Sequence, residues 1–270
     1  MNFKEKLRDI VQENNSLLCV GLDIDSEKMP NFLFGNSNDP YFEFNKSIID
    51  ATKDIVCAYK LNMAFYEVLG LEGFILLEKT ISYIPNNILV ILDGKRNDIG
   101  NTAKKYAKAF FEILNADAIT INPYLGKDGV IPFLNYKDKC SFILCRTSNP
   151  SAGDFQDLNF ENKPLFSFVA AKIKEWNDFG NCGAVVGATY PDELKIIRKK
   201  LGNDIPLLIP GIGKQGGDIA ITVKYGTNRK KEMAIINSSR GIIYAGNDDD
   251  FAESTRKAAL TLKDEINLYR

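Results

Sequence analysis

The chain has 270 residues, of which 45% are hydrophobic and 26% charged, and its formal net charge is −1 at pH 7. This composition is ordinary for a globular protein, and the near-neutral charge provides no basic field for nucleic acid or an anionic membrane. The charged N-terminus is unlike a signal peptide, and no apolar run approaches the ~20 residues that span a bilayer, so we expect a cytoplasmic protein with no membrane partner.

The chain contains no histidine and five cysteines. Without imidazole there can be no histidine acid–base chemistry, no Ser-His or Cys-His triad and no imidazole metal ligand. The cysteines are odd in number, lack the paired spacing of a zinc site and mostly lie in apolar runs, which predicts reduced, buried thiols. Catalysis must therefore depend on Asp, Glu, Lys, Arg, Tyr or Cys side chains.

Short apolar runs alternate with helical patterns along the whole chain. The predicted strands are 17–22, 55–59, 88–92, 118–121, 141–145, 183–188, 206–209 and 234–237. The predicted helices are 3–14, about 41–54, 72–83, 102–114, 128–135, 163–179, one opening at 191, and 251–268. This alternation predicts an α/β protein, a single (β/α)8 TIM barrel over residues 1–270. A doubly wound open sheet is the alternative, disfavoured because no Gly-x-Gly-x-x-Gly follows the first strand.

The third predicted strand leads directly into charged residues of alternating sign, Asp93, Lys95 and Asp98. Side chains two apart on a strand share a face, so Asp93 and Lys95 should emerge together at its carboxyl end. Burying such charges is unfavourable unless they pair. An ion pair at a strand end would explain any two of them, but three alternating charges at the mouth of a strand favour an active site.

In a (β/α)8 barrel the carboxyl ends of all strands open onto one face, where the active site is built. Asp23 follows the first predicted strand and Lys60 the second, so the fold would bring both to Asp93. Singly, Asp23 could cap a helix and Lys60 could be a solvated strand end. Together with the charges after the third strand, they predict a site.

The loops after the last two strands have the composition of a phosphate site, which such barrels often place there. Four glycines between 211 and 217 would let backbone N–H groups approach an anion, and Arg240 supplies a planar fork for phosphate oxygens. A flexible turn would explain the glycines alone, but not Arg240 as well. The loop at 146–154, rich in Gly, Pro, Ser and Asn, is interpreted as a mobile lid over this face rather than a plain surface loop.

Residues 93–102, Asp-Gly-Lys-Arg-Asn-Asp-Ile-Gly-Asn-Thr, resemble the Asp-x-Lys-x-x-Asp-Ile-x-x-Thr signature of the orotidine 5′-phosphate decarboxylase family. Further matches extend over the whole chain, at 21–23, 60–62, 146–150, 210–213 and 239–241. The segments 147–150 and 210–217 are similar to the longer-chain, type 2-like subgroup. Because a wider suprafamily shares the central motif, the additional segments decide the resemblance.

The resemblance implies a cytoplasmic carboxy-lyase that decarboxylates orotidine 5′-phosphate to UMP, the last step of de novo pyrimidine nucleotide synthesis, without cofactor or metal. It implies that Lys60, Asp93, Lys95 and Asp98 form the catalytic charge network, with Lys95 as proton donor to C6 of the pyrimidine. It also implies a homodimer in which Asp98, Ile99 and Thr102 reach the partner subunit's site. The implied substrate-binding residues are Asp23, Asn62, Ile99, Thr102, Ser148, Pro210, Gln215, Gly217, Ser239 and Arg240. Among these, Asp23, together with Lys60, would hold the ribose, Ser148 the pyrimidine, and Gln215 with Arg240 the phosphate.

Two other functions stay open at the level of sequence. A suprafamily relative such as 3-keto-gulonate 6-phosphate decarboxylase would bind Mg²⁺ and carry a Glu before the Asp-x-Lys motif, whereas the side chains at 88–92 here are aliphatic. A noncatalytic nucleotide-binding barrel, acting as a sensor or scaffold, would have no use for the intact charge network.

Overall fold

The computed structural model describes residues 1–212 and 217–270. Within them, eight parallel strands close into a barrel, in the spatial order β1-β10-β9-β8-β5-β4-β3-β2. These strands are β1 (Leu18–Gly21), β2 (Ala58–Asn62), β3 (Leu89–Arg96), β4 (Ala118–Ile121), β5 (Cys140–Arg146), β8 (Cys182–Val186), β9 (Leu207–Pro210) and β10 (Ala234–Ser238). The prediction of a (β/α)8 barrel is confirmed, and the open sheet is wrong.

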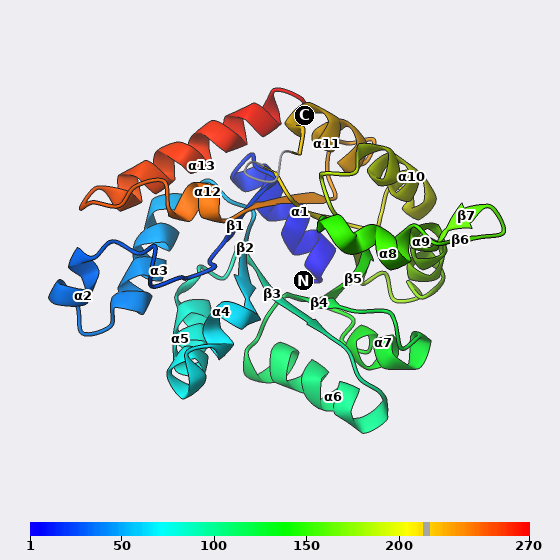
Figure 1. Cartoon of the computed structure of the whole chain (residues 1–270), viewed down its shortest axis with the longest axis horizontal. Coiled ribbons are helices and arrows are strands. Elements are labelled where there is room, and N and C mark those ends of the chain that lie inside the picture. The colour runs from blue at the N-terminus through cyan, green and yellow to red at the C-terminus, as the bar shows by residue number, and fades with distance from the viewer. Residues whose placement is uncertain (213–216) are drawn as a thin grey trace.

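Helices surround the barrel on its outside (Figure 1). The longer ones are α1 (Phe3–Glu13), α3 (Pro40–Thr52), α5 (Gly70–Tyr83), α6 (Gly100–Lys108), α7 (Lys127–Leu134), α9 (Leu165–Glu175), α10 (Pro191–Leu201), α11 (Ile219–Gly226) and α13 (Phe251–Asn267). The shorter helices are α2 (Phe32–Asn36), α4 (Met63–Glu67), the π-helix η1 (Ala109–Ile113), the 3₁₀ helix η2 (Pro150–Ala152), α8 (Gly153–Gln156) and α12 (Arg240–Ile243). A short hairpin consists of β6 (Asn159–Phe160) and β7 (Lys163–Pro164). The patterns did not predict α2, α4, α8, α11, α12 or the hairpin.

Helix α1 precedes the first barrel strand and lies across the amino-terminal end of the barrel (Figure 1). It begins with a capping box, in which the Asn2 side chain accepts from Glu5 N–H and Glu5 accepts from Asn2 N–H. Its buried Phe3 packs edge-on against Phe142 of β5, with ring centroids 5.7 Å apart. Because α1 covers the amino-terminal end, the carboxyl ends of the strands form the open end of the barrel.

The barrel wall is largely apolar on both faces, as expected of a parallel sheet covered by helices. Every residue of β1, β4, β8 and β10 is buried. All five cysteines are free and buried, as predicted, and burial raises the pKa of every thiol. At neutral pH these side chains are therefore protonated and are poor nucleophiles. No helix in the described part of the chain is long and apolar enough to cross a membrane.

Candidate active site

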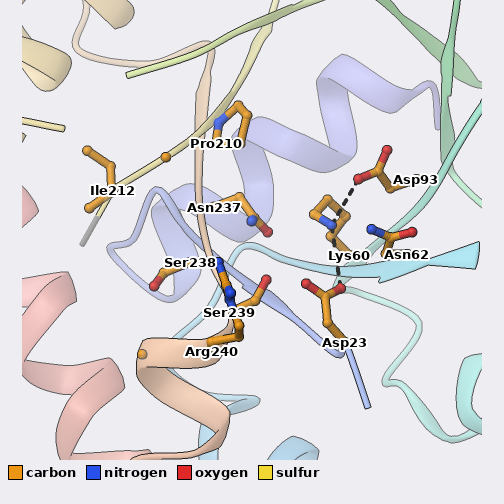
Figure 2. Close-up of a pocket in the computed structure, with 12 residues that line it drawn as sticks. Asp23, Lys60, Asn62, Asp93, Pro210, Ile212, Asn237, Ser238, Ser239 and Arg240 are labelled. Carbon is orange, nitrogen blue, oxygen red and sulfur yellow. Dashed lines mark hydrogen bonds and ion pairs between the residues drawn. The ribbon is translucent and has the colours of Figure 1, made fainter. Parts of the chain in front are cut away.

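A cavity of about 180 Å³ opens at the carboxyl ends of the strands, on the end of the barrel opposite α1. Strands β1, β2, β3, β9 and β10 and the segments that follow them contribute its lining (Figure 2). The lining residues are Asp23, Lys60, Asn62, Asp93, Pro210, Gly211, Ile212, Asn237, Ser238, Ser239, Arg240 and Gly241. Seven of the predicted site residues therefore meet in one cavity.

Lys60 lies at the floor of this cavity between two carboxylates (Figure 2). Its ammonium is 3.2 Å from Asp93 Oδ2 and 3.7 Å from Asp23 Oδ1, and its side chain is only 5% exposed. Burial alone would lower the pKa of Lys60, but the two carboxylates outweigh it and raise that pKa above its ordinary value. Lys60 is therefore a fixed cation at neutral pH.

Asp93 receives hydrogen bonds on both carboxylate oxygens. Lys60 donates to Oδ2, while Lys95 Nζ lies 2.7 Å and Thr120 Oγ1 2.8 Å from Oδ1. Burial by itself would raise the pKa of Asp93, but the two ammonium groups outweigh it and hold that pKa well below its usual value. Asp93 is thus a permanent, oriented anion in a side chain that is 12% exposed.

Lys95 contacts Asp93 through a backbone geometry that the sequence did not predict. The predicted strand 88–92 extends to Arg96, and its pairing with β4 is irregular between Leu92 and Arg96. Lys95 has a left-handed backbone, with φ at 47°. The contact between Asp93 and Lys95 was predicted correctly, but from the alternation of side chains along a regular strand, which does not hold here. The Lys95 side chain is 49% exposed and is not part of the cavity lining, but its ammonium contacts the lining residue Asp93. Lys95 therefore lies beside the mouth of the cavity rather than on its floor.

The three residues expected to act across a subunit interface lie outside the cavity lining. Asp98 is half-buried and accepts a hydrogen bond from its neighbour's N–H at 2.7 Å. Ile99 and Thr102 are exposed where α6 begins. Within one subunit, the structure therefore unites Lys60, Asp93 and Lys95 but leaves Asp98 apart from them.

The predicted phosphate end of the cavity is formed by the segments after β9 and β10. Arg240 is exposed at the first position of α12, and Ser239 lies against the end of β1. The approach to β1 requires glycine, because a Cβ atom on Gly21 would stand 1.9 Å from Ser239 Oγ. Gly217 does not line the cavity, but its N–H donates a hydrogen bond to the Gly211 carbonyl at 3.2 Å. The predicted residue Gln215 lies outside the described residues.

Ser148 follows β5 and also lies beyond the cavity lining. It packs against Gly187, where an added Cβ would lie 2.8 Å from Ser148 Cβ. The loop it belongs to is anchored by Arg146, whose buried guanidinium donates to Gln156 at 3.2 Å and to Asp157 at 3.1 Å. The interpretation of this loop as a mobile lid stays a prediction.

Sequence reasoning missed four residues that shape the site. Asn237 lines the cavity, Thr120 bonds Asp93, Arg146 holds the loop of Ser148, and Tyr244 donates to the Asp23 carbonyl at 2.9 Å. The available signal for Asn237 and Thr120 was a single polar residue at or next to an otherwise apolar run. Nothing in the pattern distinguished Tyr244 from a core aromatic residue.

The cavity combines acids and ammonium groups without a visible metal-binding set. Within residues 1–212 and 217–270, no group of three or more His, Cys, Asp or Glu side chains is placed to hold a metal ion. Independence from metal nevertheless stays a prediction. A fixed carboxylate beside a partly exposed lysine suits proton delivery to a reacting atom held next to Asp93.

The chain matches the Orotidine 5′-phosphate decarboxylase / HUMPS family over residues 16–254, a range that contains all the barrel strands. It is 49% identical to the orotidine 5′-phosphate decarboxylase of Cellvibrio japonicus over 276 residues, covering 100% of both chains. It is 48% identical to that of Dehalococcoides mccartyi over 274 residues, covering 100% of this chain and 99% of the relative. Among solved structures, OMP decarboxylase of Leishmania donovani is similar, with a TM-score of 0.87, 37% identity and coverage of 100% of this chain and 98% of that one.

Proposed function

The chain belongs to the orotidine 5′-phosphate decarboxylase family, and we propose that the Lys60–Asp93–Lys95 network carries out its reaction. The chain is a carboxy-lyase that converts orotidine 5′-phosphate to UMP and CO2, the final step of pyrimidine biosynthesis. The single observation that carries our assignment is that Asp93 is held between two ammonium groups, one buried and one at the mouth.

The chemistry needs a proton donor and a fixed negative charge close to one carbon. When the bond from C6 to the carboxylate breaks, its electron pair stays on C6, where no carbonyl or cofactor delocalises it. Lys95 then gives a proton from Nζ to C6, forming UMP, and solvent returns a proton to the amine. Preorganised Lys95 stabilises charge that develops only in the transition state, which is the interaction that raises kcat.

Asp93 contributes by repelling the substrate carboxylate. Two unit charges ~4 Å apart at an effective dielectric of ~20 repel by about 4 kcal/mol. The rate enhancement of such an enzyme lies toward the upper part of ~8–23 kcal/mol. Repulsion alone is therefore too small, and stabilisation of the carbanion by Lys95 supplies the larger share.

Lys60 and Lys95 have different parts in this scheme. Lys60 is buried between two acids that raise its pKa, so it holds its proton and keeps Asp93 and Asp23 oriented. Lys95 is half exposed and contacts only one carboxylate among the described residues. Lys95 is therefore the ammonium that can lie next to a substrate carbon.

The cavity suggests how the substrate lies. We place the phosphate against Arg240 and the glycine-containing segment around Gly211 and Gly217, with Gln215 assigned there from the sequence alone. The ribose lies over Asp23 and Lys60. The pyrimidine lies over Asp93, within reach of Ser148 once its loop closes. The remaining predicted contacts are Asn62, Pro210 and Ser239, which line the cavity.

A second subunit would complete the site. Ile99 is 56% exposed, and α6, which follows it, packs beside α7, where Ile131 is 39% exposed. Tyr124 and Leu125, before α7, are 86% and 45% exposed. Large exposed apolar side chains on neighbouring elements are the kind of surface that a subunit interface covers. We infer a homodimer in which the partner covers these side chains and its Asp98, Ile99 and Thr102 reach the site.

The thiols support our proposal for the localisation. Five buried, unpaired cysteines suit a reducing compartment, so we place the enzyme in the cytoplasm.

The test of the function is the release of CO2 from orotidine 5′-phosphate, with and without excess EDTA. We expect stoichiometric UMP and CO2 at an unchanged rate in the chelator. Loss of turnover with EDTA would favour a Mg²⁺-dependent suprafamily relative. Binding of UMP without any CO2 release would favour a noncatalytic nucleotide-binding barrel.

A further inference from the structure

The irregular pairing of β3 with β4 is centred on one buried residue, Thr120. Leu92 pairs with Ile119, and the next pair is Arg96 with Ile121. Three residues of β3, 93–95, therefore stand opposite a single residue of β4. Such an insertion bends the strand and re-aims its side chains, and here it carries both Asp93 and Lys95.

Thr120 connects the two charged residues of this bulge through its hydroxyl group. Its Oγ1 donates to Asp93 Oδ1 at 2.8 Å and accepts from the Lys95 backbone N–H at 2.9 Å. Thr120 is 1% exposed, so water does not compete for either bond. A hydroxyl is the smallest group that donates and accepts at once, and a valine of the same shape does neither.

The bond to the Lys95 N–H acts on an unfavourable backbone conformation. Lys95 has φ at 47°, in the left-handed region that residues with a Cβ atom seldom occupy. This conformation must be held by its surroundings. β4 provides the fixed support, because all of its residues are buried and it pairs on its other side with β5.

We propose that Thr120 is a positioning residue for decarboxylation, which fixes the Lys95 backbone and the Asp93 carboxylate relative to each other. This inference rests on the proposed roles of Lys95 and Asp93. Thr120 does not line the cavity, so we assign it an indirect role. It acts by keeping the proton donor and the repelling carboxylate on one rigid strand, so that Lys95 Nζ stays where C6 will lie.

The test compares Thr120→Val with Thr120→Ser, using kcat and KM for orotidine 5′-phosphate. We expect Thr120→Val to lower kcat by about 100-fold, the effect of a small misplacement of a catalytic group. We expect KM to change by less than about threefold, because phosphate and ribose contacts are untouched. Thr120→Ser, which restores the hydroxyl, should keep kcat within about threefold of the wild type.

Thr227→Val is the matched control. Thr227 is also buried, and its hydroxyl donates to the Val223 carbonyl at 2.6 Å at the end of α11. We expect this variant to keep the wild-type kcat. Binding of UMP by calorimetry checks that each variant is folded, and Thr120→Ala replaces Thr120→Val if the latter does not fold.

The proposal is overturned if folded Thr120→Val retains the wild-type kcat, or if valine and serine lower kcat equally. Lys95→Ala separates this outcome from a failure of the proposed function. If Lys95→Ala is inactive while Thr120→Val is fully active, only the role of Thr120 is wrong. If Lys95→Ala retains activity, the proposed role of Lys95 is wrong, and the role of Thr120 that depends on it is wrong as well.

Discussion

The ammonium of Lys60 lies 3.2 Å from Asp93 Oδ2, and the two side chains are only 5% and 12% exposed. Replacing Lys60 by Met would leave two carboxylates, Asp93 and Asp23, without their shared cation. Breaking a buried pair from one side destabilises a protein by about 3–5 kcal/mol. We expect Lys60→Met to lower the free energy of unfolding in urea by that amount.

Lys79→Met is the control for that loss of charge. Lys79 pairs with Asp39 at 2.7 Å, but both side chains are 47% exposed. Removing an exposed pair changes stability by about 0–1 kcal/mol. If Lys60→Met and Lys79→Met lowered the free energy of unfolding by the same amount, Lys60 and Asp93 would not form a stabilising buried ion pair.

The pH dependence of stability should report the same arrangement. The pKa of Asp93 is lowered on folding by Lys60 and Lys95, in spite of burial, so its ionised form stabilises the fold. This contribution is complete above the unfolded pKa of about 3.9 and is lost as the pH falls through the lower folded pKa. The pKa of Lys60 is raised by Asp23 and Asp93, so its contribution is complete below about 10.4 and is lost as the pH rises through the folded pKa.

Asp93→Asn isolates the acidic limb of this profile. We expect the difference in unfolding free energy between wild type and Asp93→Asn to be constant from about pH 5 to 9 and to shrink below about pH 4. Denaturant titrations at several pH values measure it. A difference that stays constant down to pH 2 would mean that folding does not lower the pKa of Asp93.

Arg240→Ala tests the phosphate end of the cavity. A hydrogen bond to a charged group contributes about 1.5–3 kcal/mol, so KM and the Kd of UMP should rise by about 10- to 150-fold. Steady-state kinetics and calorimetry measure these constants. Arg229→Ala removes another exposed arginine, one that does not line the cavity, and should leave both unchanged. Equal effects of the two variants would indicate long-range attraction rather than a phosphate contact.

Mixing two variants that we expect to be inactive tests the proposed homodimer and its shared site. Lys95→Ala removes the proposed proton donor of its own site, and Asp98→Ala removes the acid proposed to enter the partner's site. In a mixed dimer one site regains both residues, so statistical exchange should restore about a quarter of the wild-type activity. Activity after subunit exchange measures this. Native mass spectrometry confirms that mixed dimers have formed. If they are present and activity does not recover, each subunit carries a complete site.

The strands could be predicted because the barrel wall is largely apolar. The residues at which each strand begins and ends were harder to predict. Predicted strand 118–121 coincides with β4. Predicted strand 55–59 instead begins at Ala58, although residues 55–57 are fully buried. Hydrophobicity reports burial, and Ile55 and Val56 are buried before the strand, where their N–H groups bond to the Thr52 carbonyl. Cys57 already bonds to Leu18 and Leu89 on the two neighbouring strands.

The site was predictable where it depends on strand ends and unpredictable where it depends on register. Asp23, Lys60 and Asp93 converge because the carboxyl ends of parallel strands meet on one face. Thr120 lies in an apolar strand and has a role only because three residues of β3 stand opposite it. A bulge arises from pairing between distant segments, which a local pattern of polar and apolar residues does not encode.

The central claim is that Lys95 delivers the proton that turns the decarboxylated ring into UMP. The most direct measurement is single-turnover formation of UMP and CO2 by Lys95→Ala, with UMP affinity determined on the same sample. We predict that UMP formation is abolished, while UMP binding stays measurable because Arg240 and Asp23 are intact. Formation of UMP by Lys95→Ala at a rate close to that of the wild type would contradict the account.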